Sequence, residues 1–318
     1  MNIENFGKGA LKTPEPVKRD HFRLAAEPPR VIDFEKGYAV ENGFIVPQRD
    51  QDGSLSCTGQ ATSYYTVANH KIENGEDKIW SARYIYSQSF APEGGAYIWK
   101  AMSIPLKYGL ARLDQVPEDN STEAIMRDNS LNFGLTLEAK ADKYAQLENN
   151  RDINYLAGIV EDYNGFVTGF NGRNDMFDSK GVANIPATID WGHAIWVCGY
   201  CKLLDGRKAL KFKNSWTALW GDNGYGYFPE EFVKNGPLFD AYVYADILDL
   251  DNMLLSNENI NVFYQAVFHR DADAEGKAYW VGKDSFEFLK AVVGSPEFKV
   301  YDPLFKAAKA IEEFGKSL

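Results

Sequence analysis

Residues 214–225 read NSWTALWGDNGY, and residues 209–213 just before them read ALKFK, in which apolar and basic residues alternate. Alternation with a period of two predicts a strand that ends at Asn214. A run of β-branched and aromatic residues over 195–200 predicts a second strand, and His193 lies just before it. If the two strands are neighbours, the side-chain amide of Asn214 can bind the imidazole of His193 and fix the orientation of the ring.

Cys57 supplies a nucleophile for such an imidazole. A loop of Gly and Ser residues precedes it, and apolar residues then recur at helical spacing, at Ala61, Tyr64, Tyr65, Ala68 and Ile72. We expect this helix to end at Gly75 and to carry Cys57 in its first turn. A free thiol has a pKa of about 8.5, and both a helix N-terminus and a nearby imidazolium favour the thiolate.

A thiol, an imidazole and an orienting amide, in this order, are the parts of a nucleophilic acyl-transfer site. The chain resembles the papain-like cysteine peptidases from about residue 28 to about residue 246. The separation between Cys57 and His193, 193 − 57 = 136 residues, fits the gap of roughly 130–150 residues in that family. Other Cys-His hydrolase families lack the Asn-Ser-Trp block, so this block discriminates among them.

The resemblance implies a role for each matching residue. Cys57 would be the nucleophile, His193 its base and Asn214 the residue that orients His193. Gln51 lies six residues before Cys57, which is the family's spacing for the side chain that stabilises the oxyanion. Trp216 would shield the histidine–asparagine hydrogen bond from water. We expect no cofactor for this chemistry.

Further residues are assigned to substrate binding by the same resemblance. Gly94 and Gly95 resemble the paired glycines of the cleft wall, where a substrate backbone docks as an extended strand. Trp216 and Trp220 match the two tryptophans of the family's pattern, and Gly192 precedes the histidine. Gly192 also departs from the family, because many members carry an aspartate there.

Two more departures lie beside the nucleophile. Ser54 replaces the family's first cysteine, so the usual disulfide next to the active site cannot form. Thr58 replaces the tryptophan that usually follows the nucleophile. No catalytic group is removed, but these changes keep open a papain fold without peptidase activity.

The implied fold class is α+β, with a papain-like helical half and an antiparallel β half on either side of a cleft. Helices are expected after Cys57, over 81–87 and 98–108, and from an N-x-x-E capping motif at residues 120–123. The second half is rich in predicted strands, over 165–170, 194–201, 209–213, 224–228 and 241–247.

Three regions follow from this reading. Residues 1–27 are predicted to be an extended arm, too short for the family's inhibitory pro-segment, so control of activity is expected elsewhere. Residues 28–250 are the peptidase-like domain. Residues 255–318 are predicted to be a small all-α domain, resembling a domain of unknown function found in bacterial surface or secreted proteins and in phage proteins. It would serve as a tether or assembly module, or alternatively as a stabilising extension.

Composition excludes several other classes. The net charge of −11 and the lack of a clustered Lys/Arg stripe disfavour nucleic-acid binding. No run is long enough for a membrane span, and residues 1–20 lack a signal-peptide segment, so we expect synthesis in the cytoplasm.

Two motifs resemble metal sites. Cys198 and Cys201 have C-x-x-C spacing but are interpreted as packing residues. Residues 271–276 start like a calcium loop, yet Gly282 stands where the bidentate glutamate is needed, so we expect no metal.

The sequence therefore predicts a thiol endopeptidase, with a peptide or protein as substrate. A phage or virion-associated protein is one setting for it, with residues 255–318 as the contact to an assembly or surface. Two alternatives stay open. One is a structural or binding component of an assembly that keeps the fold with weak or no activity. The other is a Cys-His amidase that acts on cell walls.

Overall fold

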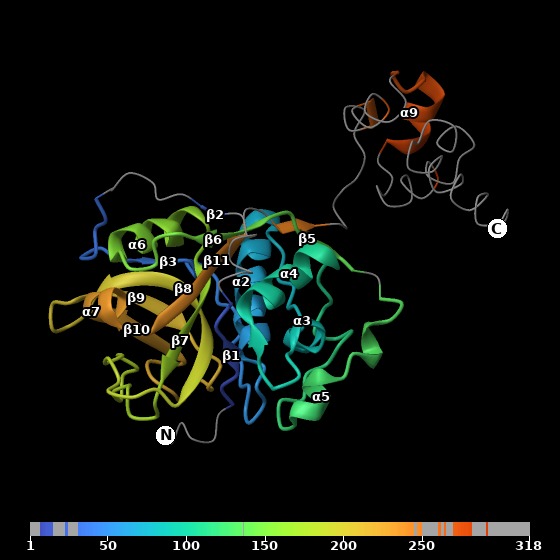
Figure 1. Ribbon diagram of the computed structural model, residues 1–318. Coiled ribbons are helices and arrows are strands. Elements are labelled where there is room, and N and C mark those ends of the chain that lie inside the picture. The colour runs from blue at the N-terminus through green and yellow to red at the C-terminus, as the bar shows by residue number, and fades with distance from the viewer. Residues whose placement is uncertain are drawn as a thin grey trace. The chain divides into compact units, whose positions relative to one another are not determined.

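The computed structural model describes residues 7–14, 23–24, 31–135, 137–244, 247–249, 260–261, 264, 270–281 and 291. The chain divides into two compact units, Met1–Leu248 and Asp249–Leu318. The first unit carries helices on one side and a large antiparallel sheet on the other (Figure 1). This is the expected α+β, papain-like arrangement of two halves. The predicted limits of three regions, at residues 1–27, 28–250 and 255–318, stay a prediction.

The helical half is built around one long helix that is buried along most of its length. Helix α2 begins at Cys57 and ends where Gly75 adopts a left-handed conformation with φ of 76°, as the sequence predicted. Ile72 was expected on its buried face but is 44% exposed, because burial stops at His70. The other helices of this half are α3 (Ala82–Ser89), α4 (Ile98–Lys107) and α5 (Glu123–Arg127), with a 3₁₀ turn at Ser130–Asn132.

The capping motif predicted at residues 120–123 is wrong in detail. Thr122, not Asn120, precedes the first residue of α5, and no side chain caps the helix. The Asn120 side chain instead accepts a hydrogen bond of 3.0 Å from Gln60 of α2. Glu123 accepts one of 2.7 Å from the backbone N–H of Leu55. Tertiary partners have therefore taken both side chains that a local capping box would use.

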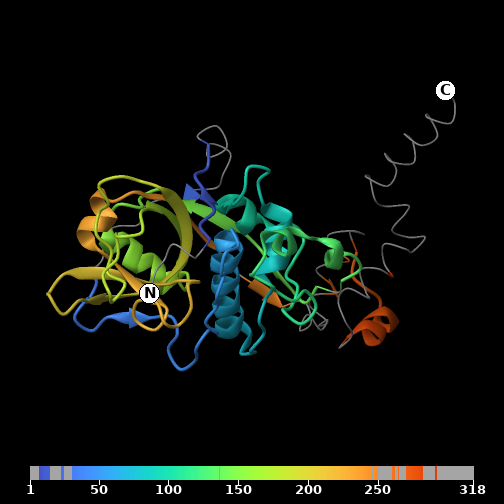
Figure 2. The ribbon, with the colours of Figure 1, turned by 90° about the horizontal axis from the view of Figure 1, so that it is seen from below.

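The β half is a sheet in the order β10-β9-β8-β7-β11-β6-β2, with β3 also pairing with β8. Its central neighbours are antiparallel, and only the short β2 pairs in parallel, with β6. Figure 2 shows the sheet and the α2 helix from below. The strands are β2 (Arg23–Leu24), β3 (Tyr38–Ala39), β6 (Tyr144–Leu147), β7 (Phe166–Gly172), β8 (Trp191–Lys202), β9 (Lys208–Lys213), β10 (Tyr225–Pro229) and β11 (Leu238–Tyr244). Helices α6 (Ile153–Asp162) and α7 (Glu230–Asn235) belong to this half, and β12 (Ile247–Asp249) pairs with β5 (Ala139–Ala141).

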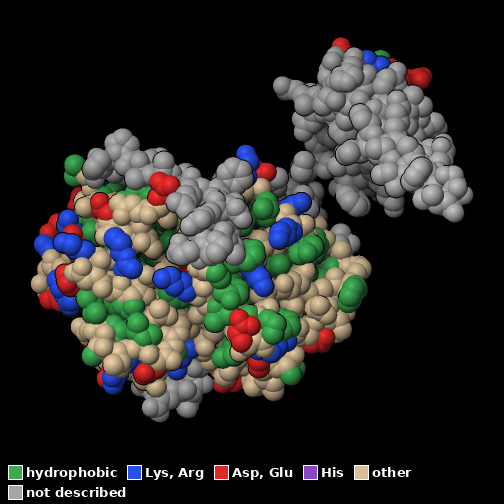
Figure 3. All heavy atoms as spheres, in the orientation of Figure 1, with side chains coloured by type: hydrophobic (Ala, Val, Ile, Leu, Met, Phe, Trp, Pro, Cys, Tyr) green, Lys and Arg blue, Asp and Glu red, His purple; other side chains and the backbone are tan. Residues whose placement is uncertain are grey.

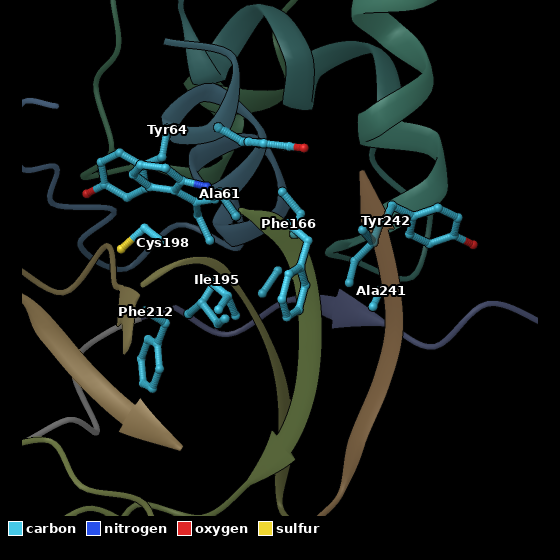
Figure 4. Packing of buried hydrophobic residues seen from close by; sticks show 14 of the residues in the cluster. Ala61, Tyr64, Phe166, Ile195, Cys198, Phe212, Ala241 and Tyr242 are labelled. Atoms are coloured by element: carbon cyan, nitrogen blue, oxygen red, sulfur yellow. The ribbon is translucent and has the colours of Figure 1, made fainter. Parts of the chain in front are cut away.

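The two halves meet through apolar side chains of α2 and the central strands (Figure 4). Tyr64 of α2 stacks on Trp196 of β8, with ring centroids 6.4 Å apart. Tyr65 of the same helix stacks on Tyr244 of β11 at 5.4 Å. All four rings are almost completely buried, so these contacts hold the middle of α2 against β8 and β11.

A short N-terminal strand lies between the two halves. Strand β1 (Ala10–Leu11) pairs in parallel with β4 (Ala96–Tyr97), and it also contacts β7 and β8 (Figure 1). Ala10 is 6% exposed, so this part of the expected arm is packed into the body.

The described residues of the second unit include one well-defined helix. Helix α9 spans Ala274–Trp280, and the Asp273 carboxylate accepts a hydrogen bond of 2.7 Å from the N–H of Gly276. This aspartate, from the rejected calcium loop, is therefore a helix N-cap. Residues 255–259, 262–263, 265–269, 282–290 and 292–318 of the predicted domain lie outside the described residues.

Surface charge is mixed on the face shown in Figure 3, where acidic and basic side chains are interspersed. Among the described residues, no helix is long and apolar enough to cross a membrane.

Candidate active site

Cys57 lies at the first residue of α2 and has no exposed surface. Burial raises the pKa of its thiol to about 11, because the thiolate would lose its hydration. Hydrogen bonds from the backbone N–H groups of Gly9, Ala194 and Thr58 act in the opposite direction. Two of these groups are outside α2: Ala194 lies on β8, and Gly9 lies in the N-terminal segment. In this state the thiol is protonated at neutral pH.

His193 faces the site from the third residue of β8, and Asn214 follows the end of β9. The two are held together by a hydrogen bond of 2.8 Å between His193 Nε2 and Asn214 Oδ1. Asn214 Oδ1 also accepts a bond of 2.8 Å from the backbone N–H of Ser215, which identifies this atom as the amide oxygen. His193 Nε2 must therefore carry the proton. In the neutral ring, Nδ1 is then unprotonated, and no described residue hydrogen-bonds to it.

The imidazole is shielded by aromatic rings on its own side of the site. The Trp216 ring lies 4.5 Å from the His193 ring, centroid to centroid, and both side chains have no exposed surface. Burial lowers the pKa of His193 to about 3, the hydrogen bond to Asn214 opposes this, and the charge of Lys8 lowers it further. Trp220 packs edge-on against Trp216 at 5.3 Å and is 4% exposed. Its described contacts are with the aromatic core behind Trp216.

Gln51 is buried and held at both ends of its amide. Its Nε2 donates to the carbonyl of Ser54 at 3.0 Å and to the carbonyl of Gly7 at 2.6 Å. Its Oε1 accepts a bond of 2.5 Å from the Ser215 hydroxyl. The carbonyl of Ser215 also accepts a bond of 2.9 Å from the backbone N–H of Gln51. Ser215 thus connects Gln51 to Asn214, its neighbour in sequence.

Two of the three glycines predicted to line the cleft, Gly95 and Gly192, are covered by the N-terminal segment. Gly94 and Gly95 have positive φ angles, of 103° and 70°, and a Cβ on Gly95 would lie 1.9 Å from the carbonyl oxygen of Gly9. A Cβ on Gly192 would lie 2.3 Å from the carbonyl oxygen of Ala10. The departure from aspartate at position 192 therefore leaves the space that residue 10 occupies.

Other predicted features of the site have plain structural outcomes. The Ser54 and Ser56 hydroxyls lie 2.8 Å apart where a disulfide would otherwise start. Cys198 is buried, Cys201 is partly buried, and both are free thiols, as their interpretation as packing residues requires. No group of His, Cys, Asp and Glu among the described residues could hold a metal ion.

Two contributions to the site were missed from the sequence. Ser215 was quoted only as part of the Asn-Ser-Trp block, and no local pattern indicated its bond to Gln51. The second is the segment from Gly7 to Thr13, which was expected to be part of an extended arm. Its Gly-Lys-Gly tripeptide is the one sequence signal, since alternate glycines allow close approach of a backbone.

Comparisons with known proteins identify the family and the fold. A model of the papain family cysteine proteases matches residues 32–236. An uncharacterized peptidase C1-like protein of Acanthamoeba polyphaga mimivirus is 25% identical over 269 residues, covering 77% of this chain and 82% of that protein. Mexicain from Jacaratia mexicana is 24% identical over 200 residues, covering 62% of this chain and 86% of mexicain. The crystal structure of xylellain, a cysteine protease from Xylella fastidiosa, shares the fold, with a TM-score of 0.60 at 20% identity over 76% of this chain and 97% of xylellain.

Proposed function

Because the chain belongs to the papain family of cysteine proteases, we propose that it is a thiol endopeptidase whose reaction is carried by Cys57, His193, Asn214 and Gln51. The observation that carries this proposal is the hydrogen bond between His193 Nε2 and Asn214 Oδ1. It leaves Nδ1 as the basic nitrogen of the ring, so the imidazole can take the thiol proton through that atom.

Each group then has a defined part in the reaction. When the site is open to solvent and substrate, His193 Nδ1 takes the proton of Cys57, and the thiolate attacks the peptide carbonyl. Gln51 Nε2 and the backbone N–H of Cys57 donate to the oxygen that becomes negatively charged. The imidazolium returns its proton to the leaving amine, and water hydrolyses the thioester that remains on Cys57.

Asn214 and Ser215 act through the residues they hold. Asn214 keeps the ring of His193 in one orientation through the charged and the neutral state. Ser215 fixes the amide of Gln51 through a bond of 2.5 Å, so that its N–H₂ group points to the site. Trp216 excludes water from the bond between His193 and Asn214, which strengthens that bond.

The test is the rate of Cys57 alkylation against pH, followed by mass spectrometry, in the parent and in His193→Ala. Both chains should also carry Gly9→Val, because a side chain at this position clashes with the backbone of Leu55 and should loosen the segment that covers the thiol. A reactive thiolate well below pH 8 that disappears in His193→Ala supports the proposal. A midpoint near that of a free thiol in both chains would contradict it and favour the structural alternative. Peptide substrates and cell-wall fragments, tested side by side, separate an endopeptidase from an amidase.

We also propose that the protein belongs to a viral assembly. The relative from a mimivirus supports it, as do the features of residues 255–318 noted from sequence. We propose that these residues tether the enzyme to an assembly or surface, after synthesis in the cytoplasm. Co-purification of the full chain, but not of a chain ending at Asp249, with virus particles is the measurement that would support this.

A further inference from the structure

The loop between Gln51 and Cys57 joins the two groups that would donate to the oxyanion. Gln51 supplies its side-chain amide and Cys57 its backbone N–H, so their relative position depends on the residues from Asp52 to Ser56. Ser54 stands where the family's disulfide would tie this loop, and the cysteines of the chain are free thiols. The loop is therefore held by noncovalent bonds.

The middle of this loop is bound by a carboxylate from α5. The backbone N–H of Leu55, two residues before the nucleophile, donates to Glu123 Oε2 at 2.7 Å. Hydrogen bonds to an ionised acceptor are shorter and roughly twice as strong as those between neutral groups. The side chain of Leu55 packs against an apolar cluster that contains Tyr86 of α3 and Met126 of α5. Leu55 is thus fixed through both its backbone and its side chain.

The Glu123 carboxylate is itself held in one orientation. Its other oxygen, Oε1, accepts bonds of 2.5 Å from the Tyr86 hydroxyl and of 2.7 Å from Arg127 Nε. Tyr86 is fully buried, and burial and the neighbouring carboxylate raise its pKa above the usual value, so the hydroxyl stays a donor. Three donors, from the loop, α3 and α5, therefore converge on one side chain where these two helices lie together (Figure 1).

A second side chain of the same segment binds the start of α2. Asn120 Oδ1 accepts a hydrogen bond of 3.0 Å from Gln60 Nε2, which also donates to the Ser56 hydroxyl at 3.2 Å. Gln60 and Ser56 are fully buried. Residues 120–123 thus contact both the loop just before Cys57 and the first turn of the helix just after it.

The charge of Glu123 reaches the nucleophile as well. Burial is the largest cause of the raised pKa of Cys57, and the negative charge of Glu123 raises it further. Besides His193 of β8, the titratable groups near the thiol include Tyr86 and Glu123, and the guanidinium of Arg127 offsets part of the carboxylate's charge. A residue that only filled space could be neutral, whereas this position combines an acceptor for the loop with a charge that acts on the thiol.

We propose that Glu123 is a positioning residue of the peptidase, which holds the loop between Gln51 and Cys57 so that their two donor groups converge on the oxygen of the substrate. This rests on the proposed function. Glu123 acts through the backbone of Leu55, and its hydrogen bonds take the place of the disulfide that Ser54 rules out. Because a misplacement of about 1 Å can cost about 10²-fold in rate, one bond at this point of the loop has a measurable effect on hydrolysis.

The first test compares Glu123→Ala with Asp128→Asn, in full-length chains that carry Gly9→Val so that substrate reaches the thiol. Asp128 is the matched control, because it follows the last residue of the same helix and its carboxylate also binds an arginine, Arg83, at 2.8 Å. Glu123→Ala should lower the kcat of peptide hydrolysis by about 10- to 10²-fold with little change in KM, since the groups that bind the substrate are retained. Asp128→Asn should match the background chain.

The second test uses Glu123→Gln, which keeps an acceptor for the N–H of Leu55 and removes the charge. It should recover most of the kcat that is lost in Glu123→Ala. Because a nearby negative charge raises the pKa of a thiol, its removal should move the midpoint of Cys57 alkylation to lower pH. Asp128→Asn, which also loses one negative charge, should leave the midpoint in place. A side chain that only stabilised the fold would not shift it.

Two results together support the proposal: a lower kcat in Glu123→Ala and a lower midpoint in Glu123→Gln. The absence of either one, in an active background chain, would overturn this proposal alone and leave the peptidase intact. Where Glu123→Ala does not fold, the midpoint in Glu123→Gln decides. A background chain without hydrolysis, whose Cys57 reacts like a free thiol with or without His193, would overturn the proposed catalytic site and this inference with it.

Discussion

The two walls of the site are fixed in different ways. On the β side, His193 is positioned by its own sheet: Asn214 binds the ring at 2.8 Å and Trp216 covers it at 4.5 Å. On the helix side, Cys57 and Gln51 have two partners, Gly9 and Gly7, that come from a separate N-terminal segment. The imidazole is thus oriented by residues of its own sheet, whereas the thiol and the Gln51 amide are bound in part by the N-terminal segment.

The largest effect is expected beneath the imidazole wall, where Lys213 ends β9 next to Asn214. Its Nζ lies 2.7 Å from Glu41 Oε1, and the two side chains are 1% and 7% exposed. Lys213→Met leaves a buried carboxylate without its cationic partner and should lower the free energy of unfolding by about 3–5 kcal/mol. Urea unfolding measures this. The control is Lys202→Met, whose exposed pair with Glu35 should contribute about 0–1 kcal/mol.

Gln51→Ala separates the two uses of one side chain on the thiol wall. Losing an oxyanion donor should lower peptide hydrolysis by about 10²–10³-fold, measured in chains that carry Gly9→Val. Losing the bond to Gly7 should also loosen the N-terminal segment, so alkylation of Cys57 in the otherwise unchanged chain should become faster. Hydrolysis and alkylation moving in the same direction would contradict this double role.

Asn214→Ala removes the bond that orients the imidazole without touching the N-terminal segment. Hydrolysis in the Gly9→Val background should fall by about 10²-fold, the lower end of what a positioned acid–base group contributes. The accessibility of Cys57 in the parent background should not change. The comparison variant is Asn235→Ala on α7, whose amide binds Glu231 away from the site. A loss of the same size in that variant would point to a general effect on folding.

The dependence of stability on pH should reflect the burial of His193 and of Cys57 in the folded chain. Burial lowers the pKa of His193 from 6.5 to about 3, so only the unfolded chain binds this proton in that interval. Stability should therefore decrease as the pH falls from about 6.5 towards 3, by at most about 1.4 kcal/mol per pH unit from this group. Burial also raises the pKa of Cys57 from 9.0 to about 11, so stability should decrease again as the pH rises through that interval.

Urea unfolding of the parent and His193→Gln, at a series of pH values, isolates the first of these two effects. Nearby charges act in the same direction as burial. The charge of Lys8 lowers the pKa of His193 further, and the charge of Glu123 raises the pKa of Cys57 further. The stability difference between parent and variant should shrink below pH 6.5. A difference that stays constant down to pH 4 would show that His193 is protonated in the folded chain.

The smallest effect is expected for Lys8→Ala. An exposed cation on an aromatic ring contributes about 0.5–1 kcal/mol, so Cys57 alkylation should rise by only about two- to fivefold. Lys8→Arg keeps the charge and should stay close to the parent. An increase as large as that of Gly9→Val would mean that the lysine side chain, and not the backbone, holds the segment in place.

Local signals were enough to predict much of the fold. The helical spacing after Cys57 predicted α2, and Gly75 ended it, because a left-handed residue without a Cβ terminates a helix at little cost. The alternation over 209–213 and the apolar run over 195–200 predicted β9 and β8, which are antiparallel neighbours. The prediction of a capping box at residues 120–123 was wrong, because partners distant in sequence bind those side chains.

The sequence by itself determined the order and spacing of Cys57, His193 and Asn214, because residue type and period are local properties of the chain. Only the tertiary structure decided which distant residues contact the site. The contacts of Gly7 with Gln51 and of Thr13 with Asp240 join residues 44 and 227 positions apart. No local pattern encodes such backbone bonds, since their donors and acceptors are the same in every residue. The sequence supplied the glycines that permit the contact, and the packing of the two halves determined where the segment lies.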